Sequence, residues 1–181
     1  TDAKMCIATD VGSSAAKGAS SLIKAMGGKG NIVNLLGNLS DPNTLIRKKA
    51  IEDTAAKYPD IKIIAEISGI DSFEAATAKM DAYLSTKSKN VDGMISTAYV
   101  PSVVGAQILT EMGDKRIKFV GIDDDAKVLE AISAGYVTGT MTQSPYGQAF
   151  AAMEGLRLLN KGYTIKKGVY FVDSGSFIIN S

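Results

Sequence analysis

Short apolar runs alternate with amphipathic stretches along the whole chain of 181 residues. Such alternation is typical of βαβ units that build a parallel sheet. Most of the runs are too apolar to be half exposed, which indicates that helices cover both faces of the sheet. The pattern therefore predicts an α/β fold that is doubly wound, with a mostly parallel sheet. The predicted strands are residues 4–8, 31–36, 61–67, 93–96, 118–122 and 137–141, and residues 168–179 are also strand-like.

The stretches between these strands carry helix signals at their ends. Serines open the first helix and Gly27-Gly28 end it, while Pro59 follows the second. Asp71-Ser72-Phe73-Glu74 has the spacing of a capping box, which predicts that a helix starts there. The predicted helices are residues 13–26, 43–58, 71–87, 101–112, 126–134 and 146–160.

The composition excludes several classes of function. The chain has 20 basic and 19 acidic residues, well interspersed, so no electrostatic footprint predicts a nucleic-acid or anionic-membrane partner. It has no histidine and one cysteine, Cys6, which excludes Ser-His-Asp and Cys-His catalysis, the usual zinc sites and CxxC redox pairs. Cys6 lies in an apolar run and is predicted to be a buried structural thiol. We therefore expect no enzyme, no cofactor and no metal, and a small neutral ligand.

Two motifs superficially suggest phosphate or metal binding. Gly27-Gly28-Lys29-Gly30 follows a helix and precedes a strand, whereas a phosphate loop follows a strand and opens a helix, so we interpret it as a turn. Asp123-Asp124-Asp125 lacks the spaced oxygen ligands of a calcium loop, and capping the next helix requires only one of the three. Asp10 and Asp123, each after a strand, leave open an enzyme with a receiver-like or flavodoxin-like sheet.

Polar residues gather just beyond the predicted strands, at the edge where open α/β sheets bind their ligands. Carboxylates and amide oxygens accept hydrogen bonds from sugar hydroxyls, and Arg and amide nitrogens donate to them, so this set suits a polyol. Capping or turn roles would also explain Asp10, Asn38 and Asp71. The residues in question are Thr9, Asp10, Asn38, Asp71, Tyr99, Asp123 and Gln143, with Arg47 in the first turns of its helix.

The stretch Val120-Gly121-Ile122-Asp123, followed by residues 134–147 (AGYVTGTMTQSPYG), resembles a block of the type I periplasmic binding proteins of the ribose and galactose sugar-binding class. That block has the form VGxD followed by xxGxxxATxxQxPxxxG, with the same step of 20 residues from Asp123 to Gln143. Residues 6–10 resemble the strand at which such proteins first enter their carboxy-terminal lobe. The resemblance covers essentially the whole chain.

The resemblance implies roles for individual residues. Asp123 and Arg47 would hold sugar hydroxyls, Gln143 would do so from the hinge, and Thr9 would line the cleft. Two positions depart from the family. Tyr99 stands near an asparagine of ribose-binding members, and Ile70 stands where many members have a stacking aromatic.

The resemblance also implies a division of the chain. Residues 1–143 would form the carboxy-terminal ligand-binding lobe, 144–167 a helix of the amino-terminal lobe, and 168–181 a return crossing and final strand. The crossings would fall near Thr9, near Gln143 and around 172–176. Nothing here corresponds to the amino-terminal lobe, and the chain starts without Met or a signal peptide, so we expect a fragment of a longer protein. Its orphaned helix, 146–160, would then be exposed or support self-association.

The function implied is the solute-binding component of an ABC sugar transporter, which binds a monosaccharide or related polyol between two lobes and delivers it to a membrane permease. Such a protein works outside the cytoplasm, in the periplasm or as an anchored lipoprotein. The alternative is the effector-binding domain of a transcription regulator of the lac-repressor type, which shares this fold.

Overall fold

The computed structural model describes residues 5–180, and they form two compact units. We call residues 11–142 and 178–180 the large lobe, and residues 5–10 and 143–177 the small unit. The chain passes between them after Asp10, Thr142 and Phe177. The division predicted from the sequence placed residues 1–143 together, whereas here residues 5–10 group with 143–177.

The large lobe is built on a six-stranded sheet of order β3-β2-β4-β5-β6-β8. The pairs β3–β2, β2–β4, β4–β5 and β5–β6 are all parallel, as the alternating pattern predicts. β6 and β8 each extend into the small unit at one end. The strands are β2 (Gly30–Leu35), β3 (Ile61–Ile67), β4 (Gly93–Ser96), β5 (Lys118–Ile122), β6 (Gly139–Gln143) and β8 (Ser176–Asn180).

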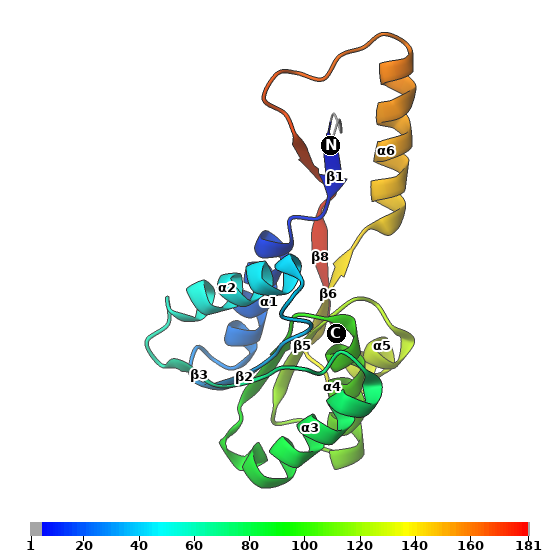
Figure 1. Cartoon of the computed structure of the whole chain (residues 1–181). Coiled ribbons are helices and arrows are strands. Elements are labelled where there is room, and N and C mark those ends of the chain that lie inside the picture. The colour runs from blue at the N-terminus through cyan, green and yellow to red at the C-terminus, as the bar shows by residue number, and fades with distance from the viewer. Residues whose placement is uncertain (1–4, 181) are drawn as a thin grey trace. The chain divides into compact units, whose positions relative to one another are not determined.

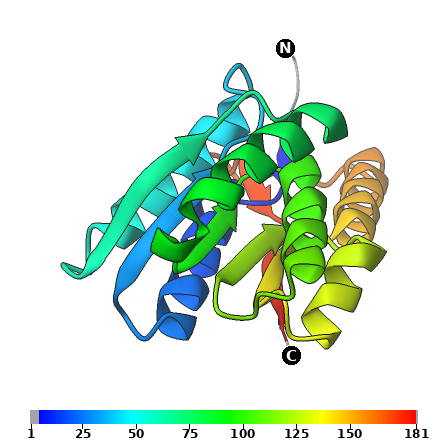
Figure 2. The ribbon, with the colours of Figure 1, turned by 90° about the horizontal axis from the view of Figure 1, so that it is seen from below.

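Helices cover both faces of this sheet, which confirms the doubly wound fold (Figures 1 and 2). One face carries α1 (Val11–Ala25) and α2 (Pro42–Ala55), and the other carries α3 (Phe73–Lys87), α4 (Tyr99–Met112) and α5 (Ala126–Ser133). Each face has its own apolar core, because alternate residues of a strand point to opposite sides. Burial of this apolar surface is the main source of the lobe's stability.

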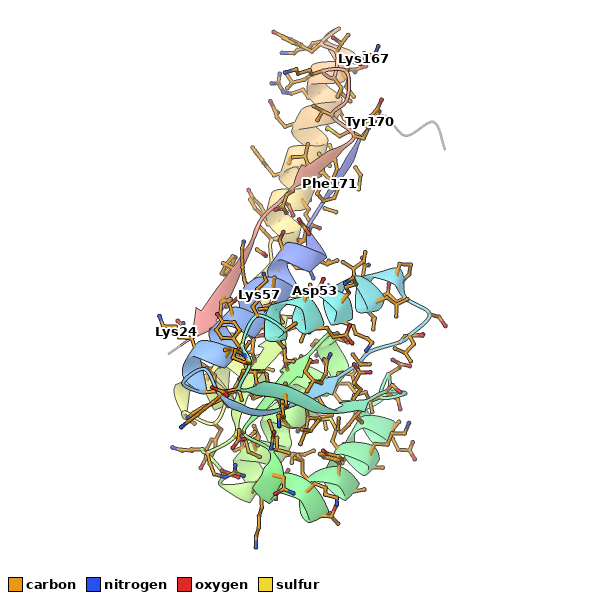
Figure 3. The ribbon with its side chains drawn as sticks, turned by 90° about the vertical axis from the view of Figure 1, so that its left-hand side faces the viewer. Lys24, Asp53, Lys57, Lys167, Tyr170 and Phe171 are labelled. Carbon is orange, nitrogen blue, oxygen red and sulfur yellow. The ribbon has the colours of Figure 1, made fainter. Side chains whose placement is uncertain are left out.

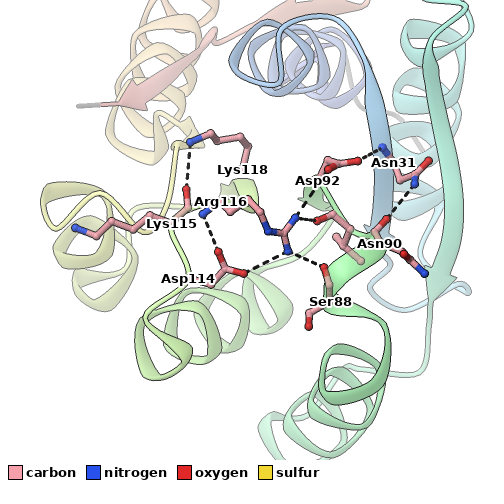
Figure 4. Close-up of polar contacts among 9 residues, drawn as sticks. Asn31, Ser88, Asn90, Asp92, Asp114, Lys115, Arg116 and Lys118 are labelled. Atoms are coloured by element: carbon pink, nitrogen blue, oxygen red, sulfur yellow. Dashed lines mark hydrogen bonds and ion pairs between the residues drawn. The ribbon is translucent and has the colours of Figure 1, made fainter.

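A network around Arg116 ties together loops at the amino ends of the strands (Figure 4). The Arg116 guanidinium donates to the carbonyl oxygens of Val91 (2.6 Å) and Ser88 (2.7 Å). Ser88 opens a short 3-10 turn, η1 (Ser88–Asn90), and Val91 follows it. Asp92 in turn accepts the backbone N–H of Asn31 at 2.8 Å. These contacts hold the loops at the amino ends of the strands, opposite the carboxyl ends where the sequence predicts the ligand-binding residues.

The small unit pairs β1 (Cys6–Ala8) in parallel with β7 (Phe171–Asp173) and packs α6 (Pro145–Asn160) against β1. None of the sixteen residues of α6, all within the described range, is buried. Tyr170 and Phe171, labelled in Figure 3, are also exposed. The prediction that Cys6 is a buried thiol is wrong, because Cys6 lies in this thin two-stranded sheet and is exposed.

Most element boundaries lie within two or three residues of the predicted ones. α3 begins at Phe73, and its N-cap is Ser72, one residue after the N-cap that the capping-box spacing predicts. The Ser72 hydroxyl accepts the N–H of Ala75 at 3.2 Å. α4 begins at Tyr99, two residues before Pro101, because the first turn of a helix does not need the N–H that proline lacks. No helix within residues 5–180 is long and apolar enough to cross a membrane.

Candidate functional site

Arg47, Tyr99 and Asp123 lie at the carboxyl edge of the large lobe's sheet, where the parallel strands end. Arg47 comes from α2, Tyr99 opens α4 after β4, and Asp123 follows β5 directly. The carboxylate of Asp123 acts electrostatically on both Arg47 and Tyr99. The structure thus brings together three side chains that are far apart in the sequence.

Asp123 has an unusual backbone conformation. Its φ of 67° lies in the left-handed region, and among the described residues other than glycine it is alone in having a positive φ. Asp and Asn adopt this conformation more readily than most residues, so the position suits an aspartate. Its N–H donates to the carbonyl of Met141 at 2.8 Å, and its own carbonyl accepts the hydroxyl of Thr140 at 2.7 Å. These bonds hold the backbone from which the Asp123 side chain leaves the end of β5.

Arg47 is anchored by the loop that follows β4. Its Nη1 donates to the carbonyl oxygen of Thr97 at 3.2 Å. Burial lowers the pKa of Arg47 overall, because it outweighs the negative charges of Asp123 and Asp41, which act in the opposite direction. The guanidinium stays protonated at neutral pH because the ordinary pKa of arginine lies far above that range. Arg47 thus offers hydrogen-bond donors, and Asp123, whose charge acts on it, offers acceptors.

Tyr99 adds an aromatic surface to these charges. Its hydroxyl donates to Asp125 Oδ2 at 2.7 Å, and this hydrogen bond, with burial and the nearby carboxylate charges, raises the pKa of Tyr99. Its ring packs edge-on against Phe73, with centroids 6.2 Å apart and planes at 86°. Both residues stay substantially exposed, Phe73 at 47% and Tyr99 at 41%. An exposed aromatic pair next to a charged pair provides an apolar face and hydrogen-bonding groups together.

Two of these residues were not predicted from the sequence. Phe73 was assigned only to a capping box, and Asp125 only to a run of three aspartates. Asp125 does cap α5, since its Oδ1 accepts the N–H of Lys127 at 2.9 Å, but it also holds Tyr99. Across the part of the chain that the structure describes, no group of three potential ligands could hold a metal ion.

Ile70 does not belong to the site. Its side chain has no exposed surface and lies in the core beneath α3 and α4. The expectation that Ile70 occupies the place of a stacking aromatic therefore needs correction: the exposed aromatic of this segment is Phe73. Asn38 has a local role, because its side chain accepts the N–H of Ser40 at 2.8 Å in a turn.

Thr9, Asp10 and Gln143 belong to the small unit. The Thr9 hydroxyl lies 3.2 Å from that of Ser174 and accepts a hydrogen bond from Gln148 Nε2 at 3.0 Å. The backbone N–H of Asp10 donates to Asp173 Oδ1 at 2.9 Å. These bonds tie β1 to the loop after β7 and to α6. Any contact of Thr9, Asp10 or Gln143 with a ligand stays a prediction from the resemblance.

Comparison with known proteins identifies the family of the chain. Residues 1–163 match the model of a family described as periplasmic binding protein domain. A xylitol-binding protein of Mycolicibacterium smegmatis is 32% identical over 147 residues, covering 81% of this chain and 42% of its own length. A D-apiose import binding protein of Actinobacillus succinogenes is 27% identical, with 86% and 50% coverage. The chain thus spans about half the length of these curated relatives.

Solved structures agree on the fold. An ABC transporter periplasmic solute-binding protein of Actinobacillus succinogenes, with bound D-allose, superposes with a TM-score of 0.81 at 26% identity, covering 95% of this chain and 60% of its own. A sugar-binding protein of a Bacillus halodurans sugar ABC transporter reaches a TM-score of 0.89 at 20% identity, with 99% and 64% coverage. The latter likeness shows the fold alone. By the family model and these relatives, the chain belongs to the periplasmic binding protein domain family.

Proposed function

We propose that this chain supplies one lobe of the solute-binding component of an ABC sugar transporter, and that its large lobe binds a monosaccharide or related polyol. The observation that carries the proposal is that Arg47, anchored on Thr97, and Asp123, whose charge acts on Arg47, lie with the exposed Phe73–Tyr99 pair at the carboxyl edge of the sheet. Sugar hydroxyls would accept from Arg47 and donate to Asp123. The apolar face of the sugar would lie on the aromatic rings.

The names of the relatives favour a neutral polyhydroxy ligand. They refer to xylitol, D-apiose and D-allose, which all lack a formal charge. They also favour transport over the alternative of a transcription regulator. Nothing in the proposed site makes or breaks a bond. Closure of two lobes on the ligand would be the only mechanism, followed by delivery to a membrane permease from outside the cytoplasm.

A second lobe would complete this binding site. The chain spans only about half of its curated relatives, and the small unit exposes large apolar side chains along α6, among them Phe150, Met153 and Leu156. A pocket of about 300 Å³ beside them is lined mainly by Met5, Ile7 and residues of α6. We assign residues 144–167 to that second lobe, which would cover this surface. Without it, α6 would be covered by another copy of the chain.

A thermal-shift screen tests the proposed ligand class. We refer to this chain joined to the second lobe as the two-lobed protein. It should be screened against pentoses, hexoses and pentitols, with sugar phosphates and amino acids as controls. Neutral sugars or polyols should raise its melting temperature, because a ligand that binds only the folded state stabilises it. Stabilisation by the charged compounds alone would contradict the proposal.

Light scattering of the 181-residue chain tests the assignment of α6. The chain should have a mass above one copy, or should bind a dye specific for exposed apolar surface. Addition of the second lobe should abolish either property. A mass of one chain together with no dye binding would contradict the assignment.

A further inference from the structure

Two buried hydroxyl groups surround the backbone that carries Asp123. Ser102 lies in the first turns of α4 and Thr140 lies in β6, and neither has any exposed surface. The Ser102 hydroxyl accepts the N–H of Ile122 at 2.8 Å. The Thr140 hydroxyl donates to the carbonyl of Asp123 at 2.7 Å. Hydrogen bonds thus hold the residue before Asp123 and Asp123 itself.

Gly121 makes room for both hydroxyls. A Cβ placed on Gly121 would lie 3.4 Å from Ser102 Oγ and 3.4 Å from Thr140 Oγ1, so the two groups converge on one side of β5. It would also lie 3.2 Å from Ser102 Cβ, which is closer than most such contacts. Glycine at this position therefore allows α4 and β6 to reach the end of β5 from two directions.

The bonds act where the strand ladder ends. β5 stops at Ile122, and the N–H of the left-handed Asp123 makes the last hydrogen bond of the β5–β6 pairing. Its N–H bonds to Met141 and its carbonyl to Thr140, which saturates both backbone groups. A residue in a sparsely populated conformation persists only when its surroundings fix it. The direction of the Asp123 carboxylate thus depends on these contacts.

Ser102 also connects Asp123 with the rest of the site. Its hydroxyl donates to the carbonyl of Ala98 at 2.7 Å, and Ala98 is the residue before Tyr99. The neighbouring Thr97 carbonyl accepts from Arg47. The loop that positions Arg47 and Tyr99 and the turn that positions Asp123 therefore meet at one buried hydroxyl.

We propose that Thr140 and Ser102 are positioning residues for ligand recognition: they fix the carboxylate of Asp123 before the ligand arrives. The proposal rests on the function proposed above. A site whose groups are already oriented loses less freedom on binding, so removal of these bonds weakens affinity without removal of any ligand contact.

The test compares variants of the two-lobed protein by calorimetry with xylitol, D-apiose and D-allose. Thr140→Val keeps the shape and removes the donor, and should weaken binding about tenfold. Thr140→Ser restores the hydroxyl and should bind within about threefold of wild type. Thr54→Val is the matched control, because Thr54 is also a buried threonine but donates to Ala50 within α2. It should leave affinity unchanged.

A double-mutant cycle separates positioning from a general effect on the fold. If Thr140 acts through Asp123, Thr140→Val should add little further loss in an Asp123→Asn background. Full additivity, or affinity of Thr140→Val within about twofold of wild type, would overturn the proposal. Ser102→Ala is the second variant if Thr140→Val does not fold, and should weaken binding at least threefold; unchanged binding would again overturn it.

Amide hydrogen exchange in the 181-residue chain tests the positioning role without a ligand. The N–H of Asp123 should exchange at least tenfold faster in Thr140→Val than in wild type, while amides of α2 keep their rates. Unchanged exchange would overturn the proposal. If the two-lobed wild type binds none of the sugars, the function proposed above fails, while this measurement still decides whether Thr140 holds Asp123.

Discussion

Helices α4 and α6 differ in how the structure covers their apolar residues. Most of α4 is buried, with Val103, Val104, Ile108 and Leu109 in the core against the sheet. α6 also carries large apolar residues, yet none of its sixteen described residues is buried. The apolar content of a helix therefore does not decide its burial. A matching surface must also be present, and the large lobe has one for α4.

Different interactions stabilise the interior of each unit. The large lobe has a continuous core on each face of its sheet. In the small unit, specific polar bonds such as those of Thr9 with Gln148 and Ser174 join β1, α6 and the loop after β7. Each hydrogen bond makes a net contribution of only about 0.5–1.5 kcal/mol to the free energy of unfolding. We therefore expect the large lobe to be the stable part of the chain.

The largest difference in stability is expected when leucine is replaced by alanine in α4 and, for comparison, in α6. Leu109 has no exposed surface, whereas Leu156 is 61% exposed. Leu109→Ala should lower the free energy of unfolding by about 2–5 kcal/mol, because it removes buried methyl groups and leaves a cavity. Leu156→Ala should change it by about 0.5 kcal/mol or less. Urea denaturation of the 181-residue chain measures both, and similar losses would remove the contrast between the units.

A glycine in each helix sharpens the comparison. A Cβ on Gly105 of α4 would lie 2.7 Å from the buried ring of Phe119, whereas on Gly155 of α6 the nearest atom is Met5 Cε at 3.6 Å. Gly105→Ala should destabilise the chain by about 1–3 kcal/mol through overpacking. Gly155→Ala should raise the helix propensity of α6, worth about 0.5–1 kcal/mol. Gly105→Ala should therefore lower the melting temperature and Gly155→Ala should raise it. Shifts in the same direction would contradict this account.

The smallest effect is expected at the surface of the large lobe. Lys48 of α2 pairs with Glu52 at 2.5 Å and with Glu66 of β3. Burial lowers the pKa of Lys48, but its hydrogen bonds to the two glutamates and their charges outweigh burial and raise it overall. Lys48→Met should cost at most about 1 kcal/mol at neutral pH, since such pairs are screened by water.

The pH dependence of this pair has a definite sign. A raised pKa in the folded state stabilises the chain below the unfolded pKa of lysine, and that contribution is lost as the pH rises through the folded value. The difference between wild type and Lys48→Met should therefore shrink in strongly alkaline solution and in 1 M salt. A difference that keeps its size under both conditions would show that Lys48 acts through packing instead.

Much of the fold could be predicted from the sequence because buried parallel strands are strongly apolar. The structure has the buried strands β4 and β5 at the predicted residues 93–96 and 118–122. The edge strand β3, which is only partly buried, also lies at the predicted residues 61–67. Helix starts were less certain, because adjacent Asp71 and Ser72 both fit an N-cap, and only Ser72 takes that role in the structure. Local patterns cannot choose between two adequate caps.

Site residues could be predicted only where they directly follow a strand, because the carboxyl ends of parallel strands lie side by side. Asp123 and Tyr99 follow strands, so their convergence at one edge follows from the parallel sheet. Ile70 and Phe73 are three residues apart near the start of α3, and only tertiary packing determines that Ile70 is buried and Phe73 exposed. Cys6 was misassigned for the same reason, since an apolar strand is buried only if something covers it.

The most direct test of the proposed site is calorimetry of Asp123→Ala in the two-lobed protein, with the sugar or polyol that gives the largest thermal shift. Asp124→Ala is the matched control, because the adjacent Asp124 is exposed. A charged acceptor is worth about 1.5–3 kcal/mol, so Asp123→Ala should weaken binding by about tenfold to more than a hundredfold, while Asp124→Ala binds like wild type. Affinity of Asp123→Ala within about twofold of wild type would contradict the assignment of this edge as the binding site.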